Sequence, residues 1–247
     1  MYNIAVSSVV PGEFFPVPDP LLDHIDPAIL NSPPGWPNPA TGVSDLAVKY
    51  LSYLDLATTF IDDFAANTLK LLGFDEGNTI ISIGHTIPLT ICGQANCVAQ
   101  TNVCLIHCSA FFLLVLVVDK TLSNNLKTDA EAQVIADAIA AFQFNNNKCR
   151  DYGLDPLDFM TIPCITMSGT CPTFYLIAVT MEPSNAVITG QHPTTQTQVL
   201  QCATVPTHSG HTDTGMEDTE YRKVALKHFL AFKELAKSHW MHILEGV

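Results

Sequence analysis

The chain has few basic residues. Its 247 residues include 11 Lys and Arg against 24 Asp and Glu, which gives a formal net charge of −13 at pH 7. A surface with this charge repels phosphate backbones at long range, which argues against general nucleic-acid binding but leaves room for a local basic patch. Charged residues make up only 14% of the chain and hydrophobic residues 47%, which indicates a folded chain with a substantial core.

The sequence also lacks a hydrophobic run long enough to span a bilayer. The run over residues 111–118 is apolar throughout, and it stays too short for a membrane helix even when it is extended back to Cys104. The first residues lack a basic segment and are broken by proline, so we expect no signal peptide. We therefore expect an intracellular protein, cytoplasmic or nuclear, without a membrane partner.

Several catalytic signatures are absent, namely a P-loop, a dinucleotide fingerprint and a G-x-S-x-G elbow. The eight cysteines are expected to be thiols, because the chain shows no sign of secretion. Four of them are an alternative zinc set, although their spacing differs from that of the usual paired knuckles: Cys92, Cys97, Cys104 and Cys108. A cysteine–histidine hydrolase is a further alternative without a local signature.

Prolines and hydrophobic patterns divide the chain into three parts. Nine of the sixteen prolines lie in residues 1–43, where we expect an irregular arm that packs on the domain through Phe14 and Phe15. Residues 44–205 are expected to form an α/β core. Residues 206–247 are expected to form a linker and an amphipathic C-terminal helix.

The pattern of the core alternates helices and strands. The expected elements are a helix over 45–72 with Ser44 as N-cap, strands over 79–91, 98–107 and 111–119, a helix over 129–145 with Thr128 and Glu131 as a capping box, a loop over 146–158, strands over 160–167, 173–180 and 197–204, and a last helix over 217–244. This order predicts an α/β fold with a central mixed sheet flanked by long helices. A right-handed crossover through the middle helix would make the strands before and after it parallel.

Two neighbouring predicted strands carry polar residues in the arrangement of a metal-dependent nuclease. Such an enzyme needs carboxylates that hold Mg²⁺ and a lysine that offsets the charge developing on the scissile phosphate. A compact solution places one acid on a strand and a Glu-x-Lys pair on the next, because residues two apart on a strand point to the same side.

Three segments carry a resemblance to a known superfamily. They are ICGQANCVAQTNVC at 91–104, FFLLVLVVDK at 111–120 and EAQVIADAIAAF at 131–142. They resemble a fungal group of unknown function within the PD-(D/E)XK, or restriction-endonuclease-like, superfamily, in which we expect ICGE, AQTDVC, a strand ending in QEDK and EPQVIAEAIAAF. The resemblance covers about residues 45–180 and implies a restriction-endonuclease-like fold.

The resemblance also implies that the catalytic set is incomplete. Asn102 stands where the metal-binding Asp is expected, and Val118 stands where the Glu is expected. Lys120 fills the lysine position, Asp119 is the variable residue before it, and Gln133 matches a glutamine that some members place near the site. Further acids are available near the first helix, namely Asp62, Asp63 and Glu76.

These substitutions favour a catalytically degenerate fold that binds a protein or nucleic-acid partner and has no cofactor. The alternatives are a Mg²⁺-dependent nuclease with substituted ligands, in which Asn102 and Asp119 hold the metal and Lys120 and Gln133 act in catalysis, or an unrelated enzyme with an apolar pocket. Arg222, Lys223 and Lys227 on the last helix are the candidate residues for partner binding. The competing interpretation is an ordinary solvated helix face.

Overall fold

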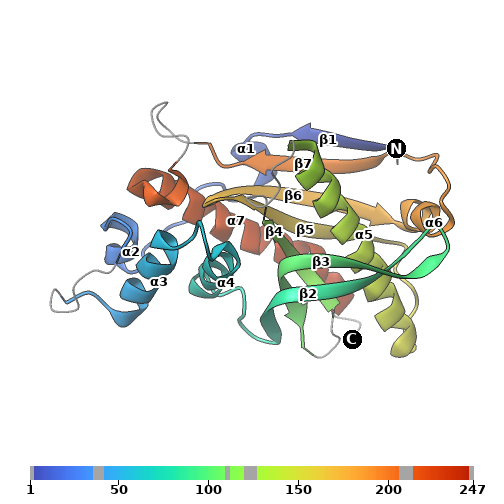
Figure 1. Cartoon of the computed structure of the whole chain (residues 1–247), viewed down its shortest axis with the longest axis horizontal. Coiled ribbons are helices and arrows are strands. Elements are labelled where there is room, and N and C mark those ends of the chain that lie inside the picture. Colours follow the sequence, from blue (N-terminus) through green and yellow to red (C-terminus); the bar gives the residue numbers. More distant parts are fainter. Residues whose placement is uncertain (1–2, 36–41, 109–111, 120–126, 206–213, 245–247) are drawn as a thin grey trace.

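The computed structural model describes residues 3–35, 42–108, 112–119, 127–205 and 214–244. Its centre is a seven-stranded mixed sheet with the order β1-β7-β6-β5-β4-β3-β2 (Figure 1). The strands are β1 Ile4–Ser8, β2 Thr79–Ile91, β3 Gln94–His107, β4 Phe112–Asp119, β5 Phe159–Ser168, β6 Cys171–Thr180 and β7 Thr197–Ala203. The expectation of a mixed central sheet is therefore confirmed.

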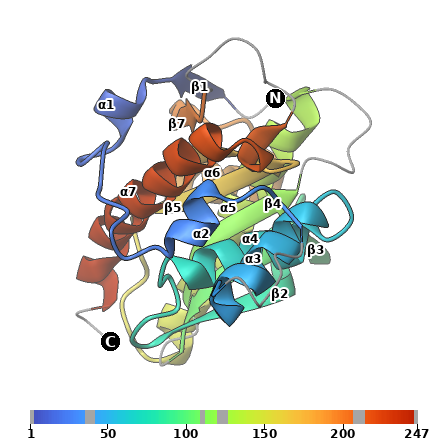
Figure 2. The same cartoon turned by 90° about the vertical axis from the view of Figure 1, so that its left-hand side faces the viewer.

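Helices cover both faces of this sheet. They are α1 Pro11–Phe14, α2 Pro27–Asn31, α3 Asp45–Asp55, α4 Ile61–Leu71, α5 Lys127–Asp151, α6 Met181–Thr189 and α7 Thr219–Leu244, with a 3₁₀ turn η2 at Gly215–Glu217. Figures 1 and 2 show α5 and α7 on opposite faces of the sheet, with α2, α3 and α4 beside α7. The predicted C-terminal helix is confirmed as α7.

The predicted crossover is also confirmed. β4 and β5 pair in parallel, with Leu116 beside Cys164 and Val118 beside Thr166, and α5 connects the two strands. β2, β3 and β4 form an antiparallel meander. The chain thus runs helix, three strands, helix, strand from α4 to β5.

The N-terminal segment is more regular than its prolines suggested. Its first residues form β1, which adds to the edge of the sheet in parallel with β7. Phe14, Phe15 and Ile29 are buried in the same core as the sheet. The expectation that the arm packs through aromatic side chains is confirmed, whereas the expectation of a wholly irregular arm is wrong.

The predicted helix over 45–72 is two helices. α3 ends at Asp55 and α4 begins at Ile61, and the two pack against each other, with the hydroxyls of Tyr50 and Thr68 3.3 Å apart. Thr58 and Thr59 lie in the connection, where β-branched residues are weak helix formers. Ser44 is the N-cap of α3 as predicted, and its hydroxyl accepts a hydrogen bond from Ala47 N.

α5 is longer than predicted at both ends. It begins at Lys127, so Thr128 lies inside the helix and is not its N-cap, and it continues to Asp151, into the first part of the segment over 146–158 that was predicted as a loop. The Asn145 side chain accepts from Leu113 N at 2.9 Å and donates to Leu113 O at 3.0 Å. This tertiary pairing stabilises a polar segment whose intrinsic helix propensity is low.

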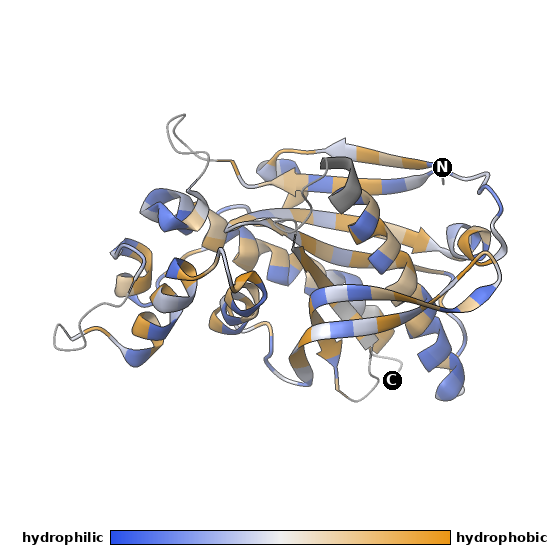
Figure 3. Ribbon diagram, in the orientation of Figure 1, coloured by the Kyte–Doolittle hydropathy of each residue, from blue (hydrophilic) through white to orange (hydrophobic). Residues whose placement is uncertain are grey.

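The core extends over both faces of the sheet. Figure 3 shows hydrophobic residues along the central strands, whereas the C-terminal end of α5 is largely hydrophilic. No disulfide joins any of the eight cysteines, all of which lie in described segments. None of the helices in the described part of the chain is sufficiently long and apolar to cross a bilayer.

Candidate functional site

Asn102 lies in β3 and turns toward the start of α4. Its Nδ2 donates to Asp62 Oδ2 at 3.3 Å. Next to Asn102, the hydroxyl of Thr101 donates to the carbonyl oxygens of Val103 and Val117, each at 3.0 Å. The neighbouring strand β2 has Gly84 with φ +67° at the same level, a conformation that kinks a strand.

The helix that Asn102 contacts belongs to the α7 side of the molecule. Lys233 of α7 donates to Leu72 O, directly after α4, at 2.9 Å. Figure 2 shows α4 beside α7 in the same layer. The predicted position of the first metal ligand is therefore part of a helix–strand contact on this side.

Val118 lies on the other face of the sheet. Its neighbour Val117 pairs with Ile165, which in turn pairs with Phe174 of β6. The Phe174 ring packs edge-on against Phe229 of α7, with the ring centroids 5.2 Å apart. Because side chains alternate along a strand, Val117 faces α7 and Val118 faces α5, where it is fully buried.

The structure therefore corrects the expectation that Asn102 and Val118 face one shared spot. Regular alternation would place both side chains on one face, and the positive φ of Gly84 on β2, at the level of Asn102, departs from a regular strand. Gln133 is exposed on the surface of α5. Lys120 and the Asp119 side chain lie outside the described part, although the Asp119 backbone ends β4.

Asp62 is an acid that the structure brings next to Asn102, the predicted metal ligand. It lies in the first turn of α4, and its carboxylate accepts the Asn102 amide hydrogen bond. Glu76 instead pairs with Lys233 of α7 at 3.0 Å. Within the described ranges, no three His, Cys, Asp or Glu side chains cluster in an arrangement that could hold a metal ion.

The alternative zinc set is not assembled. Cys97 and Cys104 lie on the same strand seven residues apart, a separation of roughly 23 Å at 3.3 Å per residue. Zinc ligands lie within about 2.3 Å of the ion, so these two thiols do not share one. Burial raises the pKa of Cys104 to about 12, as expected for an inert core thiol.

The basic residues of α7 are engaged within the molecule. Arg222 is fully buried and donates to four carbonyl oxygens, those of Ile29, Ser32, Met216 and Glu217, at 2.6 to 3.2 Å. The prediction that Arg222 is available to a partner is therefore wrong. Lys223 pairs with Glu220 at 2.7 Å, and Lys227 pairs with Asp19 at 2.5 Å.

A buried polar cluster between α5 and the sheet was not predicted. Asp137 of α5 is 2% exposed, and burial raises its pKa to about 7. Its charge also raises the pKa of Cys164, after the larger effect of burial. Asp137 Oδ2 is buried without a hydrogen-bond partner in the described segments, whereas the buried Thr166 hydroxyl lies beside that of Tyr175. The nearby Tyr175 hydroxyl accepts from Gln201 Nε2 at 3.2 Å.

A sequence signal for this cluster exists. Asp137 lies three residues after Val134 and one before Ala138, so it interrupts the apolar stripe of the predicted helix. An acid within such a stripe is buried next to the sheet, which favours its neutral form.

An apolar groove of about 280 Å³ lies on the other side of α5. Its lining is formed by Ile4, Leu89, Ile91, Ala132, Ile135, Ala136, Ile139 and Val187. The groove therefore lies between β1, β2, α5 and α6. It is a candidate for the apolar pocket of an unrelated enzyme, one of the alternatives that the sequence left open.

Comparisons with protein-family models and with curated proteins gave no match to this chain.

Proposed function

We propose that this chain is a binding module on an α/β scaffold that resembles the restriction-endonuclease-like fold, without metal-dependent cleavage at the predicted position. The order from α4 to β5 is consistent with that resemblance. The observation that carries the proposal is Val118, a fully buried hydrocarbon at the expected carboxylate position, on the face opposite to Asn102. Mg²⁺ binds where several anionic oxygens converge on the ion. A valine at the carboxylate position, on the face away from Asn102, does not favour such a site.

A protein partner is favoured over a nucleic acid. The net charge is −13, and four lysines of α7 are each paired with a carboxylate: Lys223, Lys227, Lys233 and Lys237. Such pairing removes the positive potential that phosphate binding depends on. The edge strand β2 instead exposes Ile80 and Ile83, each 48% accessible, and an edge strand can accept an extended peptide by strand addition.

The first experiment tests cleavage. The purified full chain is incubated with single- and double-stranded DNA and RNA in Mg²⁺ or Mn²⁺, with EDTA as the control. We expect no metal-dependent cleavage. Cleavage that Lys120→Ala abolishes would overturn the proposal.

The second experiment tests the partner. Nucleic-acid binding is titrated at about 50 mM salt, where electrostatic binding is strong, and we expect none at micromolar protein. Protein partners are captured by cross-linking in cell extract with wild type, Ile83→Glu and the matched exposed control Val10→Glu. We expect wild type and Val10→Glu to capture a partner that Ile83→Glu does not capture. If Ile83→Glu captures the same partner, the β2 edge is not the binding site.

One observation favours the second candidate, a nuclease with substituted ligands. The Asp62 carboxylate lies beside Asn102, so one anionic oxygen and one amide group are adjacent. If this pair holds a metal, Asp62→Asn will abolish cleavage whereas Asp63→Asn, on the next residue of α4, will not. Absence of cleavage by wild type contradicts this candidate.

A further inference from the structure

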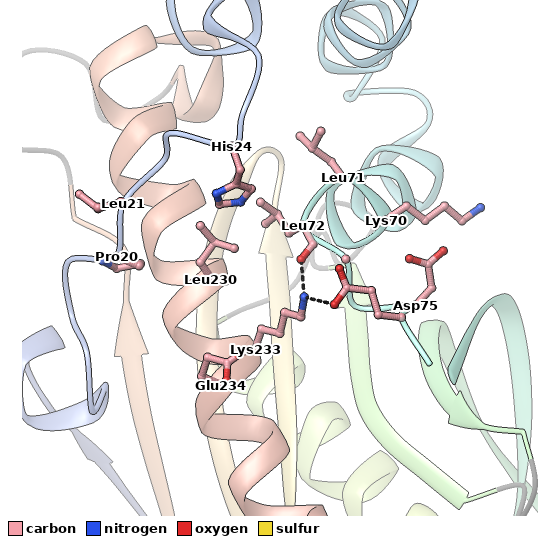
Figure 4. Close-up of a pocket in the computed structure, with 12 residues that line it drawn as sticks. Pro20, Leu21, His24, Lys70, Leu71, Leu72, Asp75, Leu230, Lys233 and Glu234 are labelled. Carbon is pink, nitrogen blue, oxygen red and sulfur yellow. Dashed lines mark hydrogen bonds and ion pairs between the residues drawn. The ribbon is translucent and has the colours of Figure 1, made fainter. Parts of the chain in front are cut away.

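A second pocket lies away from the predicted nuclease position, between α4, α7 and the N-terminal arm. It encloses about 520 Å³, a size typical of small-molecule sites. Figure 4 shows Leu21, Leu72 and Leu230 around it, with the ammonium of Lys233 near its centre. The pocket thus combines leucine side chains with polar groups, among which the Lys233 ammonium is largely buried.

Lys233 is largely buried but incompletely hydrogen-bonded. Only 8% of the residue is exposed, and its Nζ donates to Leu72 O at 2.9 Å and to Glu76 Oε2 at 3.0 Å. An ammonium group has three donors, and no acceptor in the described segments takes the third. Burial of an ammonium is costly unless its hydrogen bonds and its charge are satisfied.

The anionic partner of this buried ammonium is a surface side chain. The Glu76 side chain is 68% exposed, so solvent competes for its carboxylate, and Lys233 lowers the pKa of that carboxylate by hydrogen bonding and by charge. Water screens the exposed Glu76 carboxylate, so this particular anion contributes less to the pair than a buried one would. Exchange of Glu76 for another carboxylate therefore costs the fold little.

Gly73 keeps the space around the ammonium open. It has φ +68°, and a Cβ at this position would overlap the Glu76 carboxylate and lie 2.9 Å from Lys233 Nζ. Glycine is therefore required both for the turn after α4 and for the approach of an oxygen to Lys233.

The charges at the rim favour a singly charged ligand. Lys70 and Asp75 also line the pocket and offset each other, and Glu234 pairs with Lys237 at 3.4 Å, so Lys233 and Glu76 are the remaining charges. A dianion such as phosphate that replaces Glu76 adds a second negative charge that Lys233 does not balance, whereas a monocarboxylate leaves the local charge unchanged.

We propose that the pocket binds small organic monocarboxylates with a compact apolar body, whose carboxylate pairs with Lys233 in place of Glu76. The apolar body then lies against Leu21, Leu72 and Leu230. The competing explanation is that Lys233 only joins α7 to the end of α4. A purely structural lysine gives no preference for a carboxylate over an alcohol of the same length.

The test uses hexanoate as the probe, with 1-hexanol and hexylamine as matched neutral and cationic ligands. The full-length chain is titrated and followed by ¹H–¹⁵N NMR. We expect hexanoate to bind about tenfold more tightly than hexanol, because only a carboxylate can replace Glu76 as the anionic partner of Lys233, and we expect no binding of hexylamine. Equal affinities for hexanoate and hexanol, or no hexanoate binding at millimolar concentration, would overturn the proposal.

Variants identify the group responsible. Glu76→Gln removes the competing carboxylate and is expected to tighten hexanoate binding by about threefold or more. Lys233→Gln is expected to weaken it by about tenfold, whereas Lys223→Gln, on the outer side of the same helix, is expected to leave it unchanged. Circular dichroism checks the fold of each variant. If Lys233→Gln is unfolded, the wild-type ligand ratio and Glu76→Gln decide the result, and unchanged binding by Glu76→Gln contradicts the exchange.

Discussion

The two faces of the sheet bury polar groups in different ways. On the α7 face, the Arg222 guanidinium donates to four main-chain carbonyls, and His228 Nδ1 lies 3.0 Å from Thr204 Oγ1. On the α5 face, the carboxylate oxygen Asp137 Oδ2 has no hydrogen-bond partner in the described segments. Burial alone therefore does not decide whether a polar group stabilises the fold, because its hydrogen-bond partners do.

The comparison has a direct consequence for pH dependence. Burial lowers the pKa of His228 to about 4 and raises the pKa of Asp137 to about 7. Both shifts favour the neutral form, so one face loses stability in acid and the other loses stability as the pH rises. Single substitutions separate the two contributions.

The largest expected effect is that of Arg222→Met. The substitution leaves four buried carbonyl oxygens without their donor, and we expect a loss of about 3 to 5 kcal/mol in the free energy of unfolding. Urea denaturation measures it. The matched control is Arg150→Met on the exposed end of α5, for which we expect a change below about 0.5 kcal/mol. Equal effects of the two variants would contradict the structural role of Arg222.

Asp137→Asn is expected to have the second largest effect, with the opposite sign. The folded pKa of about 7 lies above the unfolded value near 4, so the contribution of this group is complete below about pH 4 and is lost as the pH rises through 7. We expect the variant to be more stable than wild type by on the order of 2 kcal/mol at pH 8 and to differ less at pH 5. Urea denaturation at both pH values measures this difference.

The control for this variant is Asp151→Asn, because Asp151 is exposed at the end of the same helix. We expect it to keep the pH dependence of wild type. A decrease in the stability of Asp137→Asn at pH 8 would mean that the ionised carboxylate is stabilised, in contradiction to its burial.

His228→Gln is expected to have a smaller effect, on the acid side. The folded pKa of about 4 lies below the unfolded value near 6.5, so the stability contributed by neutral His228 is complete above pH 6.5 and is lost as the pH falls toward 4. Wild type should lose about 1 to 2 kcal/mol between pH 7 and 5 through this residue, and the variant should not. The measured quantity is the difference in unfolding free energy between the two pH values. An unchanged difference in the variant would assign the acid sensitivity to another group.

The sequence predicted the sheet better than it predicted the helices. β-branched runs identified β2 to β7, and the crossover rule predicted that β4 and β5 are parallel. The continuation of α5 was missed because Asn145 is stabilised by a partner 32 residues away. β1 was missed because proline dominates the segment around it.

The sequence predicted which strands carry the candidate site residues, but not the face of the sheet to which each side chain points. Asn102 and Val118 lie on neighbouring strands as predicted. Their faces do not follow from alternation alone, and Gly84 on the neighbouring strand has a positive φ at the level of Asn102. A glycine within a strand is a warning of such a departure, but its effect on the neighbouring strand depends on tertiary contacts.

The smallest expected effect is that of Lys223→Ala, one residue after Arg222. Lys223 forms an exposed pair with Glu220 three residues earlier on α7, and pairs of this kind contribute about 0.3 to 0.5 kcal/mol. We expect urea denaturation to show a loss no larger than this, and the loss should decrease further at 1 M salt because the charges are screened. A loss comparable to that of Arg222→Met would mean that surface charge, and not the hydrogen bonding of buried groups, stabilises the α7 face. Arg222 and Lys223 are adjacent on the same helix, and one cation is buried whereas the other is partly exposed. The two variants therefore compare the contributions of a buried and a partly exposed cation to stability.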